Sequence, residues 1–155
     1  MKLLIFAVGD KLPAWAETAV AEYVKRMPRE ARIEIVAIRP EKRSGQSTER
    51  IKTLEAGRIL EKLPSGACLV ALDEHGKELG TRELADSLEG WLHSGRDTAL
   101  VIGGADGLDP GILKRAELTL SLSRLTLPHA LARVLLVEQL YRAWTVLANH
   151  PYHRD

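Results

Sequence analysis

The sequence predicts an α/β protein with a mostly parallel β-sheet. Short runs rich in β-branched and aliphatic residues alternate with longer segments of helical periodicity. The chain has 155 residues, close to the usual size of one domain, and it contains no internal repeat, heptad array or low-complexity tract. Residues 1–155 are therefore expected to form a single domain.

Five runs are expected to form strands. They cover residues 3–8, 32–38, 67–72, 98–103 and 117–123. The first run has only six apolar residues, which is too short for a secretory signal or a membrane span, so it predicts a strand in a cytosolic protein. Strands separated by helical segments imply βαβ units and hence parallel pairing.

Four longer segments carry apolar residues near helical spacing, at 13–26, 48–63, 81–93 and 130–147. Thr81, with Glu83 in the first turn, is typical of a capped helix start. The last helix is the longest, and its apolar face is too broad for a single surface stripe. It is expected either to be central to the fold or to be shared with a second subunit.

Composition excludes several classes of function. The 22 basic and 21 acidic residues leave a formal net charge of +1, so the chain has no general attraction for polyanions. The composition is that of an ordinary globular protein, with 45% hydrophobic and 28% charged residues. The single Cys68 lies in an apolar run and is interpreted as a small buried hydrophobe.

A glycine-rich stretch, GGADGLDPG, follows the fourth predicted strand at residues 103–111. Such a turn at the carboxyl end of a parallel strand lets backbone amides approach a ligand, and Pro110 suits the start of a following helix. A plain tight turn is the alternative. The GxGxxG and GxxxxGK[ST] patterns are absent, so dinucleotide and P-loop sites are poorly supported.

The segment SLSRLTLPHALAR, residues 121–133, is the second candidate binding element. An extended stretch halted by Pro128 presents backbone amides and carbonyls with no local partner, which suits a flat heterocycle. His129 is expected at the start of the long helix. A structural role in capping that helix and a catalytic role both remain open for it.

Polar residues also gather near the C-terminus. Glu138 and Arg142 are four apart on the long helix, which fits either a surface ion pair or an arginine held to grip a phosphate. His150 and His153 lack a third ligand at a supporting spacing, so no metal site is expected. Tyr152, His153 and Arg154 could stack on, exchange a proton with and bind the phosphate of a nucleic-acid base.

The combination LVALD, VIGGADG, LSLSRLTLPHALARVLLVEQLYRAW and NHPYHR resembles one family over essentially the whole chain. It is the family of small bacterial SPOUT methyltransferases that methylate N3 of a pseudouridine in 23S ribosomal RNA. The order of LTLPH, EQLYRAW and NHPYHR at the extreme C-terminus is highly specific to it.

The resemblance implies a SPOUT α/β knot, with a mostly parallel five- or six-stranded sheet, helices on both faces and a C-terminal trefoil knot. It also implies a cytoplasmic homodimer that binds S-adenosyl-L-methionine in a bent form. The residues matched to the cofactor site are Leu72, Gly103, Gly104, Gly107, Leu122, Ser123, Arg124, Leu125, Thr126 and Leu127.

The implied substrate is pseudouridine-1915 of 23S ribosomal RNA in the assembled ribosome, with no metal and no membrane partner. His129 or His153 is expected to handle the proton, Arg142 and Arg154 to place the RNA, and Tyr152 to pack on the base. Because the tail leaves a helix expected at a dimer interface, it is predicted to complete the partner's site. The alternatives are a non-catalytic ribosome-binding module with this fold and a nucleotide-dependent oxidoreductase on a conventional doubly wound sheet.

Overall fold

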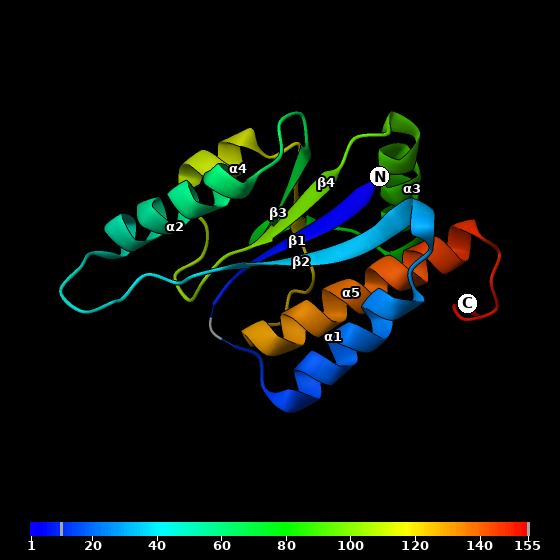
Figure 1. Ribbon diagram of the computed structural model, residues 1–155, viewed down its shortest axis with the longest axis horizontal. Helices are drawn as coiled ribbons and strands as arrows, with labels where there is room; N and C mark the ends of the chain where they lie inside the picture. The colour runs from blue at the N-terminus through cyan, green and yellow to red at the C-terminus, as the bar shows by residue number, and fades with distance from the viewer. Residues whose placement is uncertain (10, 155) are drawn as a thin grey trace.

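The computed structural model describes residues 1–9 and 11–154 and shows a sheet of five parallel strands between two layers of helices (Figure 1). The strands are β1 (Lys2–Val8), β2 (Arg32–Ile38), β3 (Cys68–Glu78), β4 (Thr98–Ile102) and β5 (Leu118–Ser121). Their spatial order is β2-β1-β4-β3-β5, and every pairing is parallel. The predicted α/β class with parallel pairing is confirmed.

The helices are α1 (Ala14–Arg26), α2 (Thr48–Lys62), α3 (Thr81–Ser94), α4 (Pro110–Arg115) and α5 (His129–Leu147), and a 3₁₀ turn, η1 (Arg29–Ala31), precedes β2. Figure 1 shows α1, α3 and α5 on one face of the sheet and α2 and α4 on the other. Pro110 opens α4 as predicted, and the Asp109 side chain caps that helix by accepting from the Gly111 N–H at 2.8 Å.

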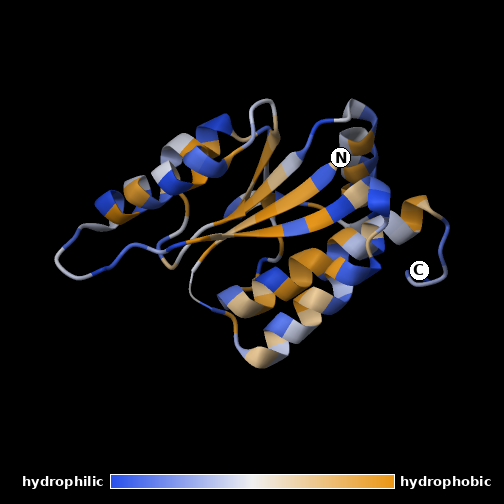
Figure 2. Cartoon of the chain, in the orientation of Figure 1, coloured by the Kyte–Doolittle hydropathy of each residue, from blue (hydrophilic) through white to orange (hydrophobic). Residues whose placement is uncertain are grey.

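Successive side chains of the inner strands point to opposite faces of the sheet, and they form two hydrophobic cores, one on each face. In β1, Leu3 and Ile5 pack toward α1, α3 and α5, whereas Leu4 and Phe6 pack toward α2 and α4. Strands buried on both faces read as continuous apolar runs, which Figure 2 shows as nearly unbroken orange along the inner strands. The edge strand β2 has polar residues among its apolar ones.

Helix α5 lies between α1 and α3. Its residues Leu136, Val137 and Leu140 are fully buried, which explains why the apolar face predicted from the sequence is so broad. Leu131, near the start of the same helix, remains 41% exposed. The helix is therefore central to the fold and still presents apolar surface outward.

Two local expectations need correction. Strand β3 continues six residues beyond the predicted end at Leu72, because its polar extension pairs with β5 through the backbone and not through apolar side chains. The start of α3 is capped by Glu83, whose Oε1 accepts from the Gly80 N–H at 2.9 Å. The Thr81 hydroxyl instead donates to Gln139 of α5 at 2.8 Å.

Candidate functional site

The glycine-rich turn after β4 folds tightly on itself. Gly107 donates its N–H to the Gly104 oxygen at 3.0 Å and has a φ of +85°, a conformation that favours glycine. A Cβ on Gly103 would lie 2.8 Å from the Gly107 carbonyl carbon, closer than such atoms approach. The turn therefore depends on glycine for its shape, and its backbone is free to line a cavity.

The segment after β5 is held by its own side chains. The Ser121 hydroxyl donates to the Ser123 oxygen at 3.0 Å, and the Ser123 hydroxyl accepts from the Leu125 N–H at 2.8 Å. These bonds satisfy part of the backbone that the sequence left without local partners. Leu125 itself is 77% exposed beside the cavity, so its side chain is available to an occupant.

These two segments and the end of β3 enclose a cavity of about 550 Å³. Every predicted cofactor-binding residue except Arg124 lines it, and so does His129. Arg124 is exposed, with its Nε 3.9 Å from Glu78 Oε1. The cavity volume lies in the usual range for small-molecule sites, and several leucines and the glycine turn are among its lining residues.

Three polar residues of this cavity, Asp73, Glu74 and His75, were missed by sequence reasoning. They form a break in β3, because Leu72 and Lys77 both pair with Leu120 and the residues between them loop outward. The sequence feature that could have revealed this break is Gly76, because a glycine within a strand often marks a bulge or a close backbone approach. A Cβ there would lie 2.7 Å from the Thr119 oxygen.

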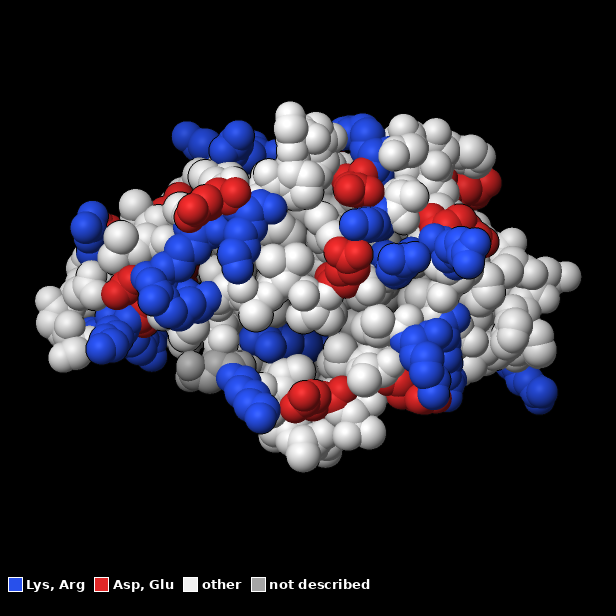
Figure 3. Space-filling view, viewed as in Figure 1, with Lys and Arg blue, Asp and Glu red and all other residues white. Residues whose placement is uncertain are grey.

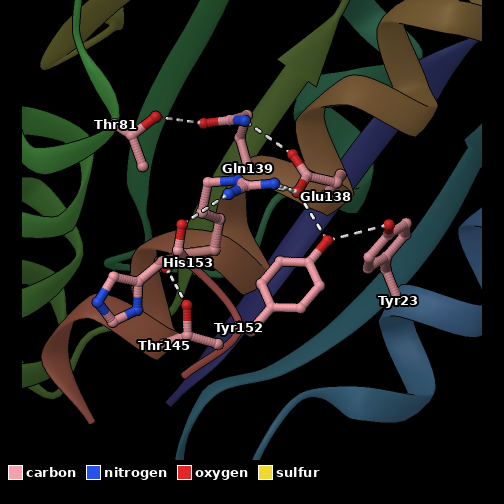
Figure 4. A network of polar contacts seen from close by, with 8 residues as sticks. Tyr23, Thr81, Glu138, Gln139, Thr145, Tyr152 and His153 are labelled. Carbon is pink, nitrogen blue, oxygen red and sulfur yellow. Dashed lines mark hydrogen bonds and ion pairs between the residues drawn. The ribbon is translucent and has the colours of Figure 1, made fainter. Parts of the chain in front are cut away.

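The predicted tail residues form a different cluster at the other end of α5 (Figure 4). The Tyr152 hydroxyl donates to Glu138 Oε2 at 2.9 Å and lies 3.1 Å from the Tyr23 hydroxyl. Arg142 Nη2 lies 2.8 Å from Glu138 Oε2, and its Nη1 donates to the His153 oxygen at 3.4 Å. The C-terminal segment is thus fastened to α1 and α5 and is not a frayed end.

Burial raises the pKa of the Tyr152 phenol, and the hydrogen bonds with Tyr23 and Glu138 raise it further. The phenol therefore stays protonated at physiological pH. Arg142 has two roles here, because it forms an ion pair with Glu138 and also anchors the tail through the His153 oxygen. His153 Nδ1 is buried and has no hydrogen-bond partner among the described residues.

The two groups of predicted residues are far apart within one chain. Helix α5 has 19 residues, so about 27 Å separates its ends. His129 lies at the end beside the cavity, whereas Tyr152, His153 and Arg154 follow the opposite end and do not line it. One chain by itself does not bring His129 and His153 together.

Neither a metal centre nor a membrane segment is found in the described part of the chain. No group of three or more His, Cys, Asp or Glu side chains among residues 1–9 and 11–154 could hold a metal ion. No helix in these residues is long and apolar enough to cross a membrane.

Comparison with known proteins identifies relatives over nearly the whole chain. Residues 1–153 match a family model described as "Predicted SPOUT methyltransferase". The chain is 59% identical to the Ribosomal RNA large subunit methyltransferase H of Ralstonia nicotianae and 56% identical to that of Burkholderia cenocepacia, with 99% of each chain covered. A probable methylase family protein from Haemophilus influenzae shares the fold, with a TM-score of 0.56 and 13% identity over 96% of this chain and 67% of its own.

Proposed function

The chain belongs to the SPOUT methyltransferase family, in the branch of ribosomal RNA large subunit methyltransferase H, and from that premise we propose its substrate and cofactor. It transfers a methyl group from S-adenosyl-L-methionine to N3 of a pseudouridine in 23S ribosomal RNA, on the assembled ribosome in the cytoplasm. The observation that carries the proposal is the cavity in which the glycine turn, the end of β3 and the segment after β5 meet.

The cavity suits S-adenosyl-L-methionine in volume and in the chemistry of its lining residues. Leu72, Leu122 and Leu127 offer apolar contact to an adenine ring, and the glycine turn offers backbone groups without side chains in the way. Asp73 and Glu74 also line the cavity, and carboxylates suit a ligand that carries a sulfonium and an ammonium group. The resemblance to known methyltransferases and the lining residues point to the same ligand.

When bound, this cofactor supplies an electrophilic methyl group whose leaving group is a neutral thioether. The protein must hold the base in line with that methyl and help N3 lose its proton. We assign the role of accepting the N3 proton to His129, which lines the cavity, or to His153 of a second protomer. Because its pKa is raised, the Tyr152 phenol keeps its proton and can only donate it in a hydrogen bond. Tyr152 therefore packs against the RNA base and does not serve as the catalytic base.

Two copies of the chain together form the working site in this proposal. Helix α5 and the neighbouring α1 expose Leu131 and Trp15, which are 41% and 57% exposed, and these side chains suit burial against another copy. The tail is anchored at the far end of α5, so His153 and Arg154 reach a cavity only if that cavity belongs to the partner. The same proposal includes the trefoil knot that the family resemblance implies, with segments 103–107 and 121–127, which line one cavity, as its loops.

The decisive experiment combines cofactor binding with analysis of the ribosome. Titration calorimetry should show that the purified chain binds S-adenosyl-L-methionine and not NAD, and mass spectrometry of 23S RNA from a deletion strain should show one lost pseudouridine methyl group. A non-catalytic ribosome-binding module predicts no cofactor binding and intact methylation. An oxidoreductase predicts binding of NAD.

The proton-handling residue is identified by pH profiles. Single-turnover methylation should be slowed by His129→Ala or by His153→Ala, and the variant that lacks the base should lose the wild-type dependence on pH. His93→Ala is a matched control, since His93 is exposed in α3 and lies outside the cavity. Wild-type rates in both test variants would show that neither histidine is the base.

The substrate is expected to be the ribosome and not free RNA. With a formal net charge of +1, the chain has little general attraction for an RNA backbone. Local cations such as Lys42, Arg43, Arg50 and Lys52, together with the terminal arginines, would engage a preassembled surface. Efficient methylation of a short isolated hairpin would contradict this expectation.

A further inference from the structure

A second cavity lies on the other side of the glycine turn. Its volume is about 690 Å³, and it is bounded by the residues after β1, the loop between β2 and α2, and the first turns of α5. The two cavities share Gly104, Ala105, Asp106 and His129. An occupant of the second cavity would therefore be separated from the cofactor cavity by the glycine turn and His129.

Cations outnumber carboxylates around the second cavity. In Figure 3, Lys and Arg side chains gather at the left over the β2–α2 loop and the adjoining helix α2. The charged residues that line the cavity are Lys11, Arg39, Lys42, Arg43, Arg133, Glu41, Glu55 and Asp106. Their formal charge is +2, so the cavity is suited to an anion.

The carboxylates of this cavity already have partners. Asp106 is paired with Arg43, and Glu41 is paired with Arg58. Glu55 is buried, and its Oε2 accepts from the Glu41 N–H at 3.0 Å. Two of the three carboxylates are thus paired with arginines, and no ion pair of Lys11, Arg39, Lys42 or Arg133 is found among the described residues.

Arg133 is the cation for which this lack of a counter-ion matters most. Its Nε is buried and has no hydrogen-bond partner among the described residues. Burial lowers the pKa of its guanidinium, because the charged form is taken out of water. A Cβ on Gly9 would lie 2.9 Å from Arg133 Nη2, so glycine at that position leaves room for the guanidinium.

Arg133 also lies close to His129 and hence to the proposed site of methyl transfer. It follows His129 by one turn of α5, and residues four apart on a helix have Cβ atoms roughly 5–6 Å apart on one face. Both side chains line the second cavity, and His129 lines the first as well. A group held by Arg133 is therefore held next to the place where the methyl acceptor must lie.

We propose that the second cavity binds a backbone phosphate of the substrate RNA, with Arg133 as the buried contact and with Lys11 and Arg39 adding positive charge. The inference rests on the proposed function, since the RNA substrate supplies the phosphate. Phosphate oxygens provide the acceptors that the guanidinium lacks, in the planar geometry that arginine prefers. Such a contact fixes the position of the nucleotide without reading its base.

The test measures binding of the full chain to ribosomes from the deletion strain over a series of KCl concentrations. Arg133→Gln should weaken binding at least tenfold and lower the slope of log K against log salt by about one, because one phosphate contact is lost. Arg133→Lys should restore the slope and part of the affinity. Arg29→Gln, which removes an exposed arginine of η1 away from both cavities, should behave as wild type.

Calorimetry with S-adenosyl-L-methionine separates this role from a structural one. Unchanged cofactor affinity in Arg133→Gln with the lower salt slope supports a phosphate contact. An unchanged ribosome affinity and slope would overturn it, and so would parallel loss of cofactor and ribosome binding in both Arg133 variants. If the wild type binds ribosomes through Arg133 but adds no methyl group, the proposed function fails and the phosphate site stands.

Discussion

Cys68 shows how one residue's surroundings decide its chemistry. It is buried at the start of β3, as expected for a small hydrophobe. Burial raises the pKa of its thiol to about 11, and the neighbouring Glu117 carboxylate contributes to the increase. The thiol is the reactive species only when it has lost its proton, so this cysteine is inert in the folded protein.

We expect Cys68 to react with iodoacetamide at pH 8 at least 100-fold more slowly than a free cysteine, because only about 0.1% of a thiol with a pKa of about 11 is ionised there. Labelling followed by mass spectrometry measures the rate. The same chain in concentrated guanidinium should react at the ordinary rate. Fast labelling of the folded chain would show that the thiol is accessible and its pKa is not raised.

Tyr152 carries a second prediction at this scale. Replacing it by Phe removes the hydroxyl that donates to Glu138, so Tyr152→Phe should lower the free energy of unfolding by about 1–2 kcal/mol at pH 7. The folded pKa of the phenol is raised above that of the unfolded chain. The contribution is therefore fully present below about pH 10 and is lost as the pH rises further.

Urea unfolding of both proteins between pH 6 and pH 11 tests this dependence. Tyr141→Phe is the matched control, because the Tyr141 hydroxyl has no hydrogen bond to another described residue, and the free-energy cost of this substitution at pH 7 should be smaller. A stability difference for Tyr152→Phe that grows above pH 10 would contradict the assigned direction of the pKa shift.

At the scale of elements, the site is built where regular structure stops. The glycine turn begins as β4 ends, the polar loop interrupts β3, and the segment 121–127 follows β5. Parallel strands bring their carboxyl ends to one edge, so these interruptions lie together. The strands act as the rigid frame, and the irregular segments supply the groups that line the cavity.

The role of the glycine turn can be tested by adding a side chain to it. Gly103→Ala should weaken S-adenosyl-L-methionine binding at least tenfold, because the new Cβ must displace the backbone at Gly107. Calorimetry measures the affinity. Gly90→Ala is the control, since a Cβ there meets nothing within 4 Å on α3, and it should leave the affinity unchanged and stabilise the fold by about 0.5–1 kcal/mol.

At the scale of the whole molecule, α5 sets the distance between the two groups of predicted catalytic residues. Its buried middle holds the sheet face together, while its two ends carry His129 and the anchored tail. A straight helix of this length cannot fold back on itself. The proposed division of one active site between two chains follows from that rigidity.

Mixed dimers test this division. At a cofactor concentration too low to fill the Gly103→Ala site, a His153→Ala/Arg154→Ala chain and a Gly103→Ala chain should each have little activity alone, and mixing them should recover up to about a quarter of wild-type methylation. The recovered sites combine an intact glycine turn from one chain with an intact tail from the other. No recovery in verified heterodimers would place both parts of the site within one chain.

The sequence by itself determined the elements of the fold, because helix and strand periodicity, Pro110 at a helix start and the glycine turn are encoded in short windows. Through its resemblance to a known family, it also predicted a set of cofactor-site residues, all of which except Arg124 line the cavity. The wrong end predicted for β3 is also a local error, because the polar end of this strand is held by backbone pairing with β5 and not by apolar side chains.

Only the tertiary structure decided which of these segments meet. The order β2-β1-β4-β3-β5 brings residues 73–75, 103–107 and 121–127 around one cavity, and helix α5 separates His129 from His153. Beside a second cavity, the tertiary structure also leaves Arg133 Nε buried without an acceptor among the described residues. Contacts between distant segments depend on how the strands and helices pack together, and the spacing of residues along the chain does not record that packing.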